Sequence, residues 1–553
     1  MLRRVVSIKI RRTTTTHRRW VSSAWKVEEV GTTDTKPQPP PPKTVAVVGA
    51  GIAGLQTIRA LKARGFNVTA FESANAVGGV WRANYANFKL QIPKQLYEFQ
   101  DFPMADVAWG AFPPGEQVQA YIEKYVDAFR MRDAIRFNTR VKGLQQMEDG
   151  TWKVQIETEQ GTQKQDFDYL VMATGLFTGA NKFIPITPGQ DKFSGKIVHS
   201  FDFWDATVAK DKRVVVVGGG KSAVDCAIEA SRAGASSVTL LQRNSHWPTP
   251  RKIAGIIPFQ YIFMSRFGTA LVSAHRGTFP GGSGKAVNAF RNSIIGPALV
   301  KPIFRMVEEL FAFQFALRGD LRPKADVVSS FYKVQFALNS DLTDMRKAGK
   351  INFQLGEIDE YVGDNTLRLK DNSSVEADLV ISATGYAQNY SIFSDPTVRE
   401  DLDLQSDGIY LYRYILPEKV KNLAFIGHVG AISNITTYGL QAEWLARYLT
   451  GNLVSGGTSE TTAQHMKDEI ETRKHWARSW MPDTTNRGML LLIHSTYYHD
   501  QLLRDMGLNP LRKSNFLSEY LMPYESADYD GIMGNAVHTD HHSNNVLRDL
   551  PNA

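Results

Sequence analysis

The sequence has a single cysteine, Cys226, among its 553 residues. One cysteine excludes an internal disulfide, a Cys-x-x-Cys redox pair and a zinc site built from cysteines. The sequence also lacks an uncharged apolar run of about 18 residues, so it predicts no membrane-spanning helix. Its two best candidates, 253–265 and 294–300, are short and interrupted by proline. They predict either buried core or segments that make peripheral contact with a membrane.

Acidic residues are missing from the N-terminus. Residues 1–27 contain eight Lys or Arg and no Asp or Glu, and the rest of the chain has 56 basic and 56 acidic residues. The net charge of +8 therefore belongs to this leader, and the neutral remainder gives no reason to expect a nucleic-acid partner. An Arg-, Ser- and Thr-rich leader without an apolar core is typical of a transit peptide, so we expect a mitochondrial protein. A cytoplasmic protein with a basic tail, or one associated with the endoplasmic reticulum membrane, stays open as the alternative.

Two stretches of the chain repeat one pattern. Residues 44–72 predict a buried strand, a glycine turn, an Ala- and Leu-rich helix and a second strand, and residues 212–243 predict the same succession. Each is a βαβ unit of a parallel sheet. The apolar runs at 168–175 and 377–385 both end in Ala-Thr-Gly, so we expect the first domain to be interrupted by the second and then resumed.

The predicted fold is therefore α/β, with two nested Rossmann-like dinucleotide-binding domains and a helical C-terminal extension. A polar, proline-rich run at 32–43 is typical of a linker. The expected segments are a basic leader and linker at 1–43, the first domain at 44–210 and again at 336–455, the second domain with a helical insertion at 211–335, and the C-terminal extension and tail at 456–553.

The first glycine turn has the spacing of a dinucleotide fingerprint. Gly49, Gly51 and Gly54 follow the pattern G-x-G-x-x-G, which allows a tight turn, close approach of the backbone to a pyrophosphate, and packing of the helix on the strand. The amides at the start of the helix then meet the phosphates. Glu72 ends the second strand, where a carboxylate accepts hydrogen bonds from ribose hydroxyls.

The second turn, Gly218, Gly220 and Ala223, differs at the position that selects the nucleotide. Its second strand ends in Arg243 instead of an acid. A guanidinium there suits a 2′-phosphate that a carboxylate would repel, so this turn predicts NADPH. The alternative is a solvated cation at the end of a strand.

Two dinucleotides in one chain indicate transfer of a hydride from NADPH to a flavin, FAD. A lone Cys226 cannot form the redox pair of the dithiol reductases that share this architecture. The remaining chemistry of a reduced flavin is reaction with oxygen.

A motif between the two turns resembles that of a known family. The stretch FSGKIVHSFDF follows the F-x-G-x-x-x-H-x-x-x-[Y/F] signature of flavin-containing monooxygenases, at Phe193, Gly195, His199 and Phe203. Related Baeyer–Villiger monooxygenases carry tryptophan at the last position of this signature, whereas Trp204 comes one residue later here. The flavin-containing class is therefore favoured.

Other segments agree with this resemblance in the same order. They are VGGVWR at 77–82, which is similar to the flavin-loop segment, ISATGY at 381–386, and YYHDQLLRDMGLNP at 497–510. The resemblance thus runs from about 44 to 510 and is strongest to plant-type members, which share Leu90-Gln91 and His246-Trp247.

The resemblance implies an FAD- and NADPH-dependent monooxygenase. NADPH would reduce FAD, oxygen would add at flavin C4a, and a soft nucleophile, an amine or a sulfide, would attack the hydroperoxide. The implied partners are oxygen and a small nucleophilic substrate, with no metal ion. A Baeyer–Villiger enzyme acting on ketones, or a flavoprotein that oxidises NADPH without oxygenating a substrate, stays open as the alternative.

The two turns and the resemblance together define the expected site. Gln91 falls where animal members have an asparagine that contacts the flavin peroxide, and its amide keeps a donor and an acceptor. His199 is either a structural residue between the domains or an acid–base group. The expected FAD-binding residues are Gly49, Ala50, Gly51, Ile52, Ala53, Gly54, Glu72, Gly79, Val80, Trp81, Leu90, Gln91 and Ile92. The expected NADPH-binding residues are Gly218, Gly220, Lys221, Ser222, Ala223, Val224, Asp225 and Arg243.

Overall fold

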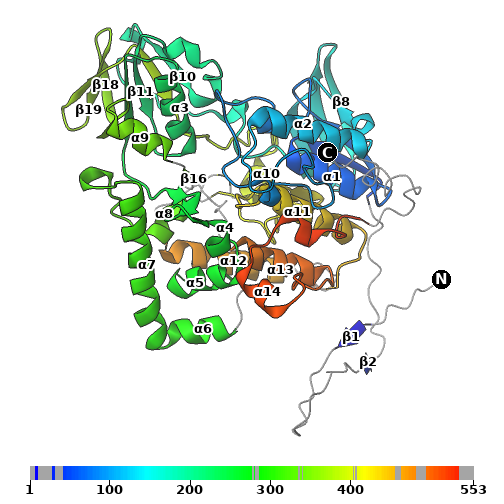
Figure 1. Cartoon of the computed structure of the whole chain (residues 1–553). Helices are drawn as coiled ribbons and strands as arrows, with labels where there is room; N and C mark the ends of the chain where they lie inside the picture. The colour runs from blue at the N-terminus through cyan, green and yellow to red at the C-terminus, as the bar shows by residue number, and fades with distance from the viewer. Residues whose placement is uncertain are drawn as a thin grey trace. The chain divides into compact units, whose positions relative to one another are not determined.

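The computed structural model divides the chain into two compact units, Met1–Pro41 and Pro42–Ala553. The residues it describes are 7–9, 28–30, 42–276, 279–280, 285–333, 337–338, 340–402, 404, 408–454, 463–480 and 494–534. In the first unit, strands β1 (Ser7–Lys9) and β2 (Glu28–Val30) pair antiparallel, and the rest of the expected transit peptide lies outside the described residues. The second unit contains both glycine turns, which precede the helices labelled α1 and α3 in Figure 1.

The first sheet of this unit has five parallel strands in the order β22-β9-β3-β4-β5. Their bounds are β3 Thr44–Val48, β4 Asn67–Phe71, β5 Ile135–Arg136, β9 Tyr169–Met172 and β22 Leu423–Phe425. Strand β3 lies in the middle and is buried from its second residue on, because both faces of a parallel sheet are covered. Helix α1 (Ile52–Lys62) joins β3 to β4, and α11 (Asn434–Leu449) packs against α1.

The second sheet has five parallel strands in the order β10-β21-β11-β12-β17. Their bounds are β10 Lys196–His199, β11 Arg213–Val217, β12 Ser237–Gln242, β17 Asn352–Leu355 and β21 Leu379–Ser382. Helix α3 (Lys221–Arg232) joins β11 to β12. The expected pair of Rossmann-like domains is therefore confirmed.

Both sheets are built on one plan. A three-stranded antiparallel sheet precedes the strand that returns to pair with the first strand of each fingerprint: β6-β7-β8 precedes β9, and β18-β19-β20 precedes β21. These strands are β6 Arg140–Gln146, β7 Trp152–Thr158, β8 Gly161–Phe167, β18 Ile358–Val362, β19 Thr366–Leu369 and β20 Ser374–Glu376. The returning strands bring Ala173 and Ala383 to equivalent places beside the two glycine turns.

Three strands correct the expected domain boundaries. Strand β21 was expected to resume the first domain within 336–455, but it pairs with β11 and β10 in the second sheet, and β17 also lies there. Strand β10, expected within 44–210, forms the edge of the second sheet. Among the described strands of the expected second part, β22 is the one that returns to the first sheet. A short apolar strand that ends in Ala-Thr-Gly is suited to the interior of either sheet. Its sequence therefore does not identify the strands with which it pairs.

Helices form most of the remainder of the second unit. Those between β12 and β17 are α4 Gln260–Phe263, α5 Arg266–Arg276, α6 Lys285–Asn292, α7 Ile295–Gln314, α8 Val327–Lys333 and α9 Asp341–Lys347. The others are α2 Gly115–Ala128, α10 Pro396–Asp401, α12 Ala463–Trp480, α13 Ser495–Asp505 and α14 Phe516–Leu521. Helices α4 to α8 lie together with α12 to α14 in the lower part of Figure 1. None of the helices in the described part of the chain has the length and apolar composition needed to cross a bilayer.

A buried ion-pair cluster joins the C-terminal helices to the helical insertion. The Nη1 and Nη2 atoms of Arg266 lie 2.6 and 2.8 Å from the carboxylate oxygens of Asp500, and its Nε pairs with Glu519. All three side chains are buried. The cluster fixes α13 and α14 against α5, because breaking one partner of a buried pair leaves an uncompensated charge.

Candidate functional site: two dinucleotide cradles

The first cradle is the turn between β3 and α1. Gly49 has a φ of +104°, and a Cβ on it would lie 2.7 Å from the carbonyl oxygen of Ala173. A Cβ on Gly54 would overlap the carbonyl oxygen of Gly49. The fold itself therefore requires these two glycines, because the turn is tight and the helix packs closely on the strand.

Gly51 is different, because the fold does not require a glycine there. Its φ of −74° and ψ of −175° suit any residue, and the nearest atoms to an added Cβ are those of Gly79, at 3.7 and 3.9 Å. Gly51 is also the N-cap of α1, which has no side-chain cap. The first amides of α1 thus face a space that a side chain at residue 51 would fill, as a pyrophosphate site requires.

Glu72 lies against this turn, directly after β4. One of its carboxylate oxygens accepts a hydrogen bond from the amide of Ala50 at 2.9 Å, and the other accepts one from the amide of Ala74 at 2.8 Å. Each oxygen keeps lone-pair capacity for a further donor, such as a ribose hydroxyl. The structure therefore brings Glu72 to the glycine turn as the sequence predicts.

Two further segments carry the remaining expected FAD-binding residues. The amide of Gly78 donates to the carbonyl of Ala50 at 3.1 Å, which places the short turn Gly79–Trp81 over the glycine loop. The indole of Trp81 donates to the hydroxyl of Tyr97 at 2.9 Å. In the segment that follows, Leu90 and Ile92 are buried and Gln91 between them is half-buried.

The second cradle, between β11 and α3, repeats this construction. Gly218 has a φ of +144°, and a Cβ on it would overlap the carbonyl oxygen of Ala383, just as Gly49 lies against Ala173. Gly220 is the N-cap of α3 and offers no side-chain cap. Ala223, at the third position of the pattern, is fully buried. The first amides of α3 are therefore presented in the same way as those of α1.

The end of β12 carries the charge that distinguishes the second cradle. Gln242 is buried, and Arg243, the next residue, is exposed and has no ion-pair or hydrogen-bond partner within the described part of the chain. The side chain at the corresponding place of the first cradle is the carboxylate of Glu72. Opposite charges at equivalent strand ends suit two different dinucleotides.

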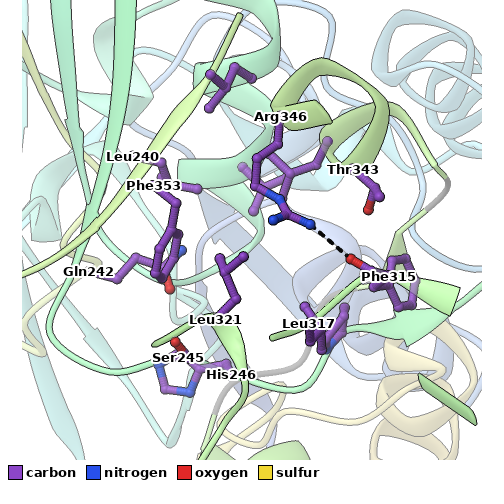
Figure 2. Close-up of a pocket in the computed structure, with 14 residues that line it drawn as sticks. Leu240, Gln242, Ser245, His246, Phe315, Leu317, Leu321, Thr343, Arg346 and Phe353 are labelled. Atoms are coloured by element: carbon purple, nitrogen blue, oxygen red, sulfur yellow. Dashed lines mark hydrogen bonds between the residues drawn. The ribbon is translucent and has the colours of Figure 1, made fainter. Parts of the chain in front are cut away.

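A cavity of about 60 Å³ adjoins this strand end (Figure 2). Its lining is mainly apolar and includes Leu240, Gln242, Ser245, His246, Leu317 and Phe353. A Cβ on Gly219 would lie 2.7 Å from His246 Cδ2, so the cavity reaches the glycine turn. Inside it, the Arg346 guanidinium donates to the backbone carbonyls of Phe315 and Ala316, both at 3.1 Å, and burial lowers its pKa.

Lys221 and Asp225 join the two cradles to each other. The Lys221 ammonium pairs with Asp225 one helical turn away, and the hydroxyl of Tyr85 donates to the second oxygen of Asp225 at 2.9 Å. Nearby, the Asn87 amide donates to Glu229 at 2.6 Å. Burial lowers the pKa of Lys221. The structure thus places the Lys221 ammonium on Asp225, and a contact of either residue with a nucleotide stays a prediction.

Arg251 is a candidate site residue that the sequence pattern did not reveal. Its guanidinium lies 4.0 Å from the ring centre of Phe112 and 3.4 Å from the carbonyl oxygen of Leu90, and its Nε is buried without a hydrogen-bond partner. Burial lowers its pKa, while Asp225 acts in the opposite direction. An incompletely bonded guanidinium between the Gln91 segment and α3 is available to an anionic or carbonyl group of a ligand.

The contacts of His199, the histidine of the signature motif, indicate a structural role. His199 Nδ1 accepts a hydrogen bond from the amide of Phe201 at 3.1 Å, so its Nε2 donates to the carbonyl of Gly385 at 2.9 Å. Burial lowers the pKa of this ring. Both nitrogens of a neutral imidazole are therefore used to attach β10 to the loop after β21, which favours the structural role over the acid–base one.

Comparison with known proteins identifies the family. The model of the family described as Flavin-binding monooxygenase-like matches residues 42–279 and 320–518. The chain belongs to this family. The resemblance that the signature indicated is thus confirmed, and the protein is a flavin-dependent monooxygenase.

Individual relatives span most of the chain. It is 28% identical over 525 residues to the probable flavin-containing monooxygenase 1 of Arabidopsis thaliana, which covers 88% of the chain and 96% of the relative. It is also 28% identical over 460 residues to flavin-containing monooxygenase 1 of Homo sapiens, covering 79% of the chain and 78% of that protein.

Two solved structures share the fold. The S-allyl-L-cysteine S-oxygenase from Allium sativum matches with a TM-score of 0.56 and 19% identity, over 84% of the chain and 89% of that structure. The cyclohexanone monooxygenase from Rhodococcus sp. Phi1 bound to NADP+ matches with a TM-score of 0.62 and 18% identity, over 85% and 97%. One acts on sulfur and the other is named for a ketone, so the shared fold does not choose between these substrates.

Proposed function

We propose that the protein binds FAD in the first cradle and NADPH in the second, and that it oxygenates a nitrogen or sulfur atom of a small nucleophilic substrate. The observation that carries the cofactor assignment is the matched pair of glycine turns whose following strands end in opposite charges, Glu72 in one and Arg243 in the other. A carboxylate suits a free ribose diol, and a guanidinium suits a 2′-phosphate.

When bound, FAD supplies hydride acceptance from NADPH and the activation of oxygen. The chain's own residues bind, orient and exclude water. Leu90 and Ile92 are buried, and Trp81 packs against Tyr97 and Phe88 at centroid distances of 5.3 and 5.7 Å. These side chains form an apolar and aromatic wall beside the first cradle, and a dry site strengthens the few hydrogen bonds that act on reacting atoms.

Gln91 is the residue that we assign to the reacting oxygen. It is half-buried between two buried neighbours, and its amide offers both a donor and an acceptor. Gln91→Leu keeps the size of the side chain but removes the amide, whereas Gln91→Asn keeps the amide. We expect Gln91→Leu to divert about tenfold more NADPH to hydrogen peroxide than the wild type, and Gln91→Asn to stay closer to it.

The signature supports a soft nucleophile over a ketone. Its last residue, Phe203, is buried in the core of the second domain, whereas the adjacent Trp204 is exposed. The buried aromatic residue at the last position of the motif is therefore Phe203, and the neighbouring Trp204 does not take its place. The Baeyer–Villiger class has tryptophan at this position.

The substrate class is tested by measuring product and hydrogen peroxide per NADPH consumed, with a tertiary amine, a thioether and a cyclic ketone. We expect a product-to-NADPH ratio approaching unity for the amine or the thioether. Turnover of the ketone alone would assign the protein to the Baeyer–Villiger class. Peroxide equal to the NADPH consumed with every compound would identify an NADPH oxidase.

We also propose that the acid-free leader directs import into mitochondria. Its composition of eight basic residues without an acid supports this proposal. Fractionation of cells that express the full chain, with protease treatment of intact mitochondria, tests it. A chain that stays in the cytosol or in microsomes would contradict it.

A further inference from the structure

Helices α6 and α7 lie in a part of the chain that the family model leaves unmatched, residues 280–319. Helix α7 is apolar on two sides. One side, with Val300, Phe304 and Phe311, is buried, and α7 packs against α5 and α8. A helix that is apolar on more than one side normally needs a second cover.

The other side of α7 faces solvent. Ile295 is 63% exposed, Leu299 54%, Met306 66% and Phe313 85%. These residues recur at intervals of four and seven, so they lie along one side of the helix. Ile294, which precedes the helix, is also exposed. We call these five residues the α7 surface. Contiguous exposed apolar side chains of this kind mark an interaction site.

Two cations on α7 lie beside the α7 surface. In the sequence, residues 230–307 contain ten Lys or Arg and no Asp or Glu, but some of these cations are paired away from α7, such as Arg232 with Asp341 and Arg266 with Asp500. On α7, Lys301 and Arg305 are exposed and have no carboxylate partner within the described part of the chain. The first acids after this stretch are engaged: Glu308 accepts from the amide of Val327 at 2.9 Å, and Glu309 pairs with Arg322 at 2.5 Å. The α7 surface is therefore apolar and flanked by free positive charge.

We infer that the α7 surface docks on an anionic phospholipid membrane, with the helix lying in the plane of the interface. Large apolar side chains on one face and Lys or Arg beside them are the composition of an interfacial helix. Two cations near an anionic surface add attraction that falls with salt. A second copy of this chain is a less suitable partner for the α7 surface. A two-fold interface would bring Lys301 and Arg305 toward the same cations of the other copy, and like charges repel.

Flotation of the full-length holoenzyme with vesicles tests this inference. The vesicles are phosphatidylcholine alone, or a mixture in which one third of the lipid is phosphatidylserine. We expect strong binding to the anionic vesicles at low salt and weak binding to the neutral ones. The double variant Leu299→Glu, Met306→Glu should reduce binding at least about tenfold, and Lys301→Gln, Arg305→Gln should reduce it by about fivefold per cation.

The leader is also basic and could itself bind anionic vesicles. All variants therefore keep the leader unchanged, so that a loss of binding is caused by the change in α7. Ile186→Glu is the matched control, because Ile186 is an isoleucine outside α7 that is 98% exposed, and this variant should bind like the wild type. FAD content and NADPH oxidation should be unchanged in all of them, which shows that they fold. Binding that survives both double variants would overturn the inference, as would a dimer in solution that Leu299→Glu dissociates.

Discussion

The first cradle makes a prediction that separates what the fold needs from what the cofactor needs. Gly51 and Gly54 belong to the same turn, yet an added methyl group meets different surroundings at each. At Gly51 the nearest atoms are 3.7 Å away, in ordinary contact, and the backbone suits alanine. At Gly54 the methyl group would overlap the carbonyl oxygen of Gly49.

The expected stabilities follow from these contacts. Gly51→Ala loses the modest advantage of glycine over alanine at an N-cap, less than about 1 kcal/mol. It gains about 0.4–1 kcal/mol from the reduced entropy of the unfolded chain. The apoprotein should therefore keep its free energy of unfolding to within about 1 kcal/mol. Gly54→Ala overpacks the turn and should lose about 1–3 kcal/mol or more.

Binding of FAD should be sensitive to the substitution at Gly51, which leaves the stability of the apoprotein almost unchanged. A methyl group at residue 51 enters the space in front of the first amides of α1, where a pyrophosphate would accept hydrogen bonds. Loss of one or two such bonds to a charged acceptor, at about 1.5–3 kcal/mol each, weakens binding by about a hundredfold. Urea unfolding of the apoproteins and fluorescence titration with FAD provide the two measurements. A Gly51→Ala protein that binds FAD like the wild type would refute the assignment of this cradle.

Three further predictions concern the second cradle and the core. Arg243→Gln should raise the KM for NADPH about ten- to a hundredfold and leave that for NADH unchanged, because only NADPH carries the 2′-phosphate; equal effects on both would exclude the assigned role. Arg266→Met should lower the free energy of unfolding by about 3–5 kcal/mol, since Asp500 and Glu519 stay buried without their cation; a loss below about 1 kcal/mol would contradict this. Burial lowers the pKa of His499 to about 3, from an ordinary value of 6.5. Below pH 6.5 this ring binds a proton in the unfolded chain but not in the folded protein, so His499 alone should lower the free energy of unfolding by about 1.4 kcal/mol per pH unit toward pH 3. His499→Gln should make the measured decline less steep, and an unchanged slope would count against the buried ring as its source.

The local parts of the site follow directly from the sequence. The spacing of Gly49, Gly51 and Gly54 specifies a turn within a few residues, and the structure has that turn between β3 and α1. The same holds for Gly218 and Gly220 before α3. The predicted and observed elements coincide here because the formation of a strand, a turn and a helix depends mainly on residues that are close in sequence.

Positions that depend on distant partners were decided by the tertiary structure. Strand β21 joined the second sheet although its pattern matched β9, because strand pairing is selected by the whole sheet. Lys221 lies at the start of α3, as expected, and its ion pair with Asp225 is visible only in the tertiary structure. Arg251 reached the Gln91 segment through a contact about 160 residues apart in sequence.

The sequence by itself determined the two cradles, their order, the charges at their strand ends and the family. Only the tertiary structure decided how the cradles are attached to each other, through Tyr85 and Asp225, and which side of α7 stays uncovered. The physical reason is that turn geometry and periodicity are local properties, whereas burial and pairing are settled between segments that the sequence keeps far apart.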